Sequence, residues 1–173
     1  MMHRAWMAAL AGGALLLGAC SQQSGEKPAA ESEGTAAPAP AATAAAASQK
    51  FVATLTGANE VPAVKTSASG TATFTQTSDS TLDFTIMLDS IENVTMAHLH
   101  KGAAGQDGPP VVPLFQGAFS GSGTLVSGTI KASDLKGTTM AALLAAIRAD
   151  SIYVNVHTKA HPSGELRGQV MAP

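Results

Sequence analysis

The sequence predicts an all-β domain, a Greek-key antiparallel β-sandwich or barrel with one short helix. Beyond Lys50, apolar residues recur at every second position in several short segments. Glycine, proline, asparagine and aspartate separate these segments, as expected for turns. No helix long enough for a parallel crossover separates most of them, so neighbouring strands should pair antiparallel.

The clearest expected strand spans residues 81–89, where Leu82, Phe84, Ile86 and Leu88 alternate with polar side chains. The turn after residue 76 joins it as a hairpin to the strand before it. The other expected strands span 51–56, 70–76, 94–101, 123–131, 151–158 and 165–171.

One helix interrupts the strands. Met140, Leu143, Leu144 and Ile147 recur at helical spacing and should form a core-facing stripe. Thr138 or Thr139 is the expected cap.

Residues 1–19 have the pattern of a secretion signal. His3 and Arg4 precede an apolar run of about 15 residues, which is too short to span a membrane comfortably. The run ends in Leu17-Gly18-Ala19-Cys20, which resembles the lipobox of bacterial lipoproteins. That resemblance implies that Cys20 is acylated, begins the mature chain and anchors it to a membrane. Ser21 in place of aspartate implies the outer membrane; the alternative is an ordinary signal peptide that contains a cysteine.

Residues 20–49 are predicted to be a disordered tether between the lipid anchor and a domain at 50–173. The tether is rich in alanine, proline and serine and contains no aromatic residue. It therefore has too little apolar surface to offset the entropy of ordering.

Charge and cysteine content exclude a nucleic-acid-binding protein and a disulfide-stabilised domain. The chain has 10 basic and 12 acidic residues without a basic stripe, which excludes a nucleic-acid partner. Cys20 is the only cysteine, so the mature domain has no disulfide despite its expected export.

Three histidines are candidate metal ligands. His98 and His100 share one face of an expected strand, about 7 Å apart, with Leu99 toward the core. His157 lies on the polar face of the strand at 151–158. If the two strands are neighbours, three imidazoles can converge on copper, zinc or nickel. Alternatively, the histidines bond to nearby loops such as 102–112, or are exposed.

Three segments resemble the CHRD domain, which is named after chordin and also occurs in exported bacterial proteins. They are LTGANEVPAV at 55–64, MAHLHKGAAGQDGPPVVPL at 96–114 and YVNVHTKAHPSGELRGQV at 153–170. The resemblance covers nearly all of 51–170 and implies an extracytoplasmic β-fold. It supplies no functional residue.

A β-hairpin is followed by the HxH strand of His98 and His100 with a Gly-rich loop after it, a later strand with a single histidine, and a Gly-x-x-Arg turn at 164–167. This order of features is similar to that of copper-zinc superoxide dismutase. That similarity implies that His98, His100 and His157 match three copper ligands and that Arg167 contacts an anion. The expected loop at 102–117 has no histidine, so the bridging histidine and zinc site have no counterpart. Asp107 and His161 are possible substitute ligands away from the family's positions. Dismutase activity is therefore not expected even with copper bound.

Two functions remain. The first is a non-enzymatic, membrane-anchored CHRD lipoprotein that binds an unidentified envelope protein or ligand. The alternative is a periplasmic copper-binding protein with a dismutase-like three-histidine site. No nucleophile elbow or nucleotide-binding fingerprint is present. The sequence favours the first function, because it needs only the anchor, the tether and the domain.

Overall fold

The structure is a computed structural model that describes residues 48–135 and 137–173. The expected signal peptide at 1–19, the lipidation site Cys20 and nearly all of the tether lie outside these residues. Within the described residues, no helix is long and apolar enough to cross a membrane.

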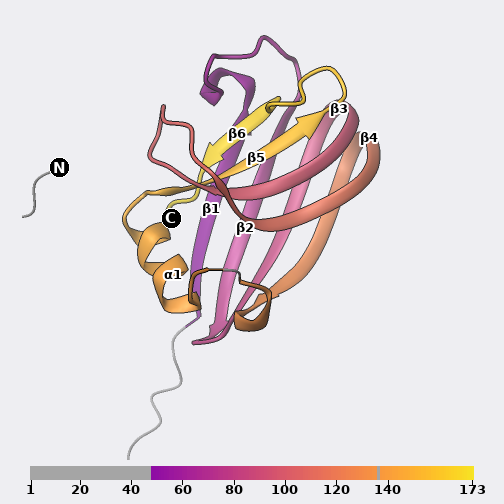
Figure 1. Cartoon of the computed structure of the whole chain (residues 1–173). Helices are drawn as coiled ribbons and strands as arrows, with labels where there is room; N and C mark the ends of the chain where they lie inside the picture. Colours follow the sequence, from indigo (N-terminus) through magenta and orange to yellow (C-terminus); the bar gives the residue numbers. More distant parts are fainter. Residues whose placement is uncertain (1–47, 136) are drawn as a thin grey trace, which may run out of the picture. The chain divides into compact units, whose positions relative to one another are not determined.

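The predicted all-β class with one helix is confirmed (Figure 1). A single antiparallel sheet has the strand order β2-β1-β6-β5-β3-β4, and an additional pairing of β2 with β3 closes it into a ring. The elements are β1 (Gln49–Thr56), β2 (Ser69–Ser78), β3 (Thr81–Lys101), β4 (Pro110–Lys131), α1 (Met140–Arg148), β5 (Ile152–Thr158) and β6 (Leu166–Gln169), with short 3-10 turns at Gly57–Asn59 and Ala132–Asp134.

Two long strands, β3 and β4, each extend through two parts of this ring. The first part of β3 pairs with β2 and the last part pairs with β5, while β4 follows the opposite edge throughout. In Figure 1 the two strands run side by side and curve strongly. Ser90 and Asn93 on β3, and Gly121 and Gly123 on β4, have positive φ angles at the bend. Such irregularities let one strand turn a corner between two packed layers.

Three sequence-based expectations were wrong at this hairpin. The strands expected at 81–89 and 94–101 form one strand, and the strand expected at 123–131 is the second half of β4. The expected loop at 102–117 ends early, because β4 begins at Pro110. The sequence did not indicate this strand because Pro110 and Pro113 lie in it, and proline has no backbone N–H to donate to a neighbouring strand. It is tolerated here because β4 is an edge strand.

The core follows the predicted alternation. The four apolar residues of 81–89 are buried, and so is the stripe of α1. Thr139 caps α1 by accepting a hydrogen bond from the Ala142 amide at 3.2 Å. On β3, Ala97 and Leu99 are fully buried, which turns the intervening His98 and the following His100 to the opposite face.

We expect Leu99→Ala to lower the free energy of unfolding by about 2–5 kcal/mol, because it leaves a cavity under the histidine-bearing strand. Met87→Ala is the matched control on β3, since Met87 is 55% exposed. It should cost about 0.5 kcal/mol or less. Urea denaturation of both variants measures the difference, and equal losses would contradict this account of the core.

Candidate metal centre

The pairing of β3 with β5 brings the three predicted histidines together. In this register His98 is opposite Asn155, His100 is opposite Tyr153, and His157 is opposite Met96. Residues directly opposite one another share a face of the sheet, so the histidines all project from the same side. The convergence that the sequence left conditional is therefore present.

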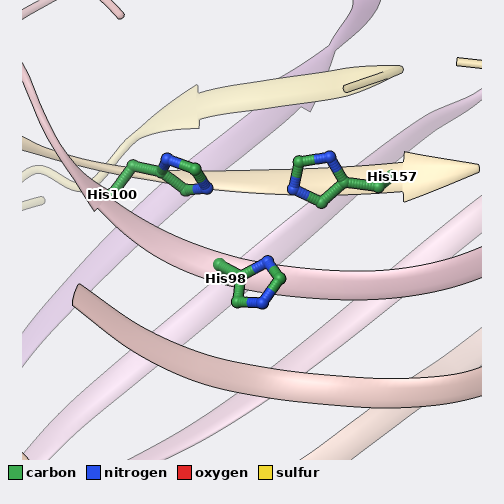
Figure 2. Close-up of side chains that lie close together, drawn as sticks. All are labelled: His98, His100 and His157. Carbon is green, nitrogen blue, oxygen red and sulfur yellow. The ribbon is translucent and has the colours of Figure 1, made fainter. Parts of the chain in front are cut away.

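The histidine cluster, His98, His100 and His157, has the geometry of a three-nitrogen ligand set. One ring nitrogen from each lies within 4.8 Å of the others. The ring centroids are 5.3–5.9 Å apart, and Figure 2 shows the rings converging from β3 and β5. Metal–nitrogen bonds of about 2.0–2.1 Å would require the rings to close by roughly 1 Å. Small side-chain rotations can provide that movement.

Backbone carbonyls fix the tautomers of two of the rings. His100 Nδ1 is 2.9 Å from the Gly108 carbonyl oxygen, and His157 Nδ1 is 3.0 Å from that of Pro162. A carbonyl only accepts hydrogen bonds, so each Nδ1 carries the hydrogen and each Nε2 keeps its lone pair. Those two Nε2 atoms and Nδ1 of His98 are buried without a hydrogen-bond partner. His100 and His157 therefore each offer an unused lone pair, and His98 Nδ1 offers a third in the tautomer that carries the hydrogen on Nε2.

Burial also keeps the histidine cluster neutral. Desolvation lowers the pKa of all three histidines below the ordinary value of 6.5. A neighbouring histidine charge adds to this effect at His98 and His157, and the nearby Arg167 guanidinium adds to it at His100. Neutral imidazole is the form that coordinates transition metals, so the cluster needs no deprotonation near pH 7.

Arg167 supports the cluster from behind Tyr153. Its guanidinium carbon lies 3.5 Å from the Tyr153 ring centroid, and that ring stacks on His100 at 5.0 Å. The same guanidinium pairs with Asp107 at 2.9 Å and donates to the backbone carbonyls of Ala103 and Gln106. Arg167 thus holds the 102–109 loop, which contains the Gly108 carbonyl that orients His100.

This arrangement bears on three residues that the sequence singled out. Arg167 is 2% exposed and already has these partners, while its predicted anion contact stays a prediction. Asp107, a suggested substitute ligand, pairs with Arg167. His161, the suggested fourth nitrogen, is outside the cluster.

Sequence reasoning missed Glu60, a buried acid beside the cluster. Asn155 donates to Glu60 Oε2 at 3.4 Å, while Glu60 Oε1 and Asn155 Oδ1 have no partner. Both unpartnered oxygens lie so close to Gly164 that a Cβ there would be within 2.5 Å of each. Burial raises the pKa of Glu60 to about 7. The alternation of residues in β5 predicts that Asn155 lies on the same face as His157. Nothing in the segment around Glu60 predicts that this acid is buried.

A depression of about 300 Å³ gives access to the cluster on the His98 side. Its lining consists of His98, residues 110–113 at the start of β4, and Asp134. His100 and His157 are 9% and 7% exposed, so His98 is the most accessible ring. Solvent or a small ligand would reach a bound metal from this side.

The family model of the CHRD domain matches residues 51–170. The chain belongs to the CHRD family. No curated protein matches the chain. The three segments that suggested CHRD meet at this site: 55–64 supplies Glu60, 96–114 supplies His98, His100 and Gly108, and 153–170 supplies His157 and Arg167. The signature segments of this CHRD domain are thus the parts of the chain that build the cluster and its surroundings.

We expect Glu60→Gln to change how stability depends on pH. The pKa of Glu60 is about 7 in the folded protein, against an ordinary value of 4.5. The wild-type protein therefore loses folding stability as the pH rises between those two values. The variant should gain about 1–3 kcal/mol relative to wild type between pH 4 and pH 8. Thermal or urea unfolding across this range measures the gain. A difference that stays constant with pH, or an equal gain in the exposed control Glu92→Gln, would contradict the burial of a titrating acid.

Proposed function

We propose that this CHRD protein is a non-enzymatic copper-binding module, held in the bacterial cell envelope by a lipid on Cys20. The observation that carries the proposal is the histidine cluster with three buried, unpartnered ring nitrogens. Leaving such polar atoms without partners costs free energy, and coordination of one metal ion would satisfy all three.

The donor set favours copper over other metals. Among the described residues, no cysteine or carboxylate belongs to the cluster. Imidazole suits copper, zinc and nickel, and divalent copper has the highest affinity in that series. His98, His100 and His157 would hold the ion, and the Gly108 and Pro162 carbonyls would keep two of the rings oriented.

The surroundings of the cluster support binding more than turnover. Arg167 is engaged by Asp107 and two carbonyls, so drawing an anion to the metal would require breaking existing bonds. His161 is the only other histidine among the described residues and lies outside the cluster, so the ligand set includes no additional imidazole to deliver protons. An ion bound here would be stored, carried or presented to a partner.

A second candidate is a module that recognises an envelope ligand without metal. The observation in its favour is a groove of about 580 Å³ along the seam between β1 and β6. Its polar lining includes Asn59, Glu60 and Gln169. The histidine cluster would then be a structural feature of the same domain.

Copper loading of the purified protein should give about one equivalent of metal. The triple variant His98→Ala, His100→Ala, His157→Ala should retain none, because it removes every ligand. His161→Ala is the matched control and should load normally. Elemental analysis after desalting, with circular dichroism to check folding, makes the comparison. Metal-free parent protein, or equal loading of parent and triple variant, would favour the second candidate.

Cys20→Ala should release the protein from the membrane fraction, because it removes the residue that would carry the anchoring acyl chains. Mass spectrometry of the wild-type amino terminus should show a lipid-modified cysteine. Ser21→Ala is the adjacent control and should stay membrane-bound. Membrane retention of the Cys20 variant would rule out anchoring through this residue.

A further inference from the structure

We propose that the copper-loaded centre favours Cu(I), with the thioether of Met96 as its fourth ligand. This proposal rests on the copper-binding function above and specifies the ion and one additional donor. Three independent features carry it: the position of Met96, its exposure and the charge around the cluster.

Met96 occupies a sheet position beside two of the three ligands. It is directly opposite His157 in the β3–β5 register and two residues before His98 on β3. Directly opposite residues have Cβ atoms about 4.5–5.5 Å apart. Ala97 and Leu99 face the core, so Met96 shares the outer face with His98 and His100. A methionine side chain, with three rotatable bonds, can adjust from there toward the cluster.

The exposure of Met96 favours this role over packing. The Met96 side chain is 37% exposed. A polar side chain at this position would cost no core packing, so packing does not account for the methionine. The thioether is the only soft donor that the β3–β5 register places beside the histidines. Soft thioether ligands select Cu(I) over harder divalent ions.

The electrostatics of the site point in the same direction. Among the residues that the structure describes, no carboxylate belongs to the cluster. The positive charge of Arg167 lies behind the Tyr153 ring that stacks on His100. Its partner Asp107 is 65% exposed, so water screens the negative charge more than the buried positive one. Because the cost of burying an ion rises steeply with its charge, a buried ligand set without a carboxylate favours the monovalent ion.

Copper affinities of the Met96→Leu variant test the proposal. Leucine keeps the size and apolar character of the side chain but removes the sulfur. Met87→Leu, at the exposed methionine elsewhere on β3, is the matched control. Anaerobic competition with a Cu(I)-specific chelator should show at least tenfold weaker Cu(I) binding by Met96→Leu, with Cu(II) binding nearly unchanged. The reduction potential should fall by about 59 mV for each tenfold loss.

X-ray absorption of the Cu(I)-loaded parent and of the Met96→Leu variant provides a second readout, which reports the ligands directly. We expect one sulfur neighbour besides nitrogen, and loss of that sulfur in Met96→Leu only. A parent spectrum without sulfur, or unchanged Cu(I) affinity in Met96→Leu, would overturn the role of Met96. Tighter binding of Cu(II) than of Cu(I) by the parent would overturn the choice of ion. Either result leaves the copper site standing, whereas a parent that binds no copper rejects the proposed function itself.

Discussion

The antiparallel register of β3 against β5 is the constraint on which the rest of the site depends. It sets His98, His100 and His157 on one face and places Tyr153, Asn155 and Met96 among them. A shift of one residue would turn the β5 side chains to the opposite face and remove Val154 and Val156 from the core. Burial of that apolar face therefore holds the histidines together, so the energy that stabilises the fold also assembles the histidine cluster.

Chain segments cover the outer face of β5. This cover removes the side chains of the cluster from water and so determines their protonation. Every residue of β5 is buried, although alternate residues are polar. The 102–109 loop lies over His100 and Tyr153 and is held by Arg167, while Gly164 lies against Glu60 and Asn155. Desolvation under this cover is what keeps the imidazoles neutral and raises the pKa of Glu60.

Sequence periodicity was sufficient to predict the fold class, the helix and the faces of the histidines, because these depend on local alternation of side chains. It could not predict the β3–β5 register, which depends on contacts between residues far apart in the chain. The same limit explains Arg167, whose interactions with Asp107 and Tyr153 no local pattern reveals. The first half of β4 was missed because Pro110 and Pro113 are read locally as loop residues, whereas at the edge of a sheet they are compatible with a strand.

The prolines of β4 have a consequence for self-association. An unpaired strand edge is a template on which a second molecule can add a strand. Pro110 and Pro113 remove backbone donors from this edge, and the bend around Gly121 and Gly123 prevents a long flat pairing surface. The prolines that made β4 difficult to predict from the sequence, together with the bend, thus protect the domain against edge-to-edge aggregation.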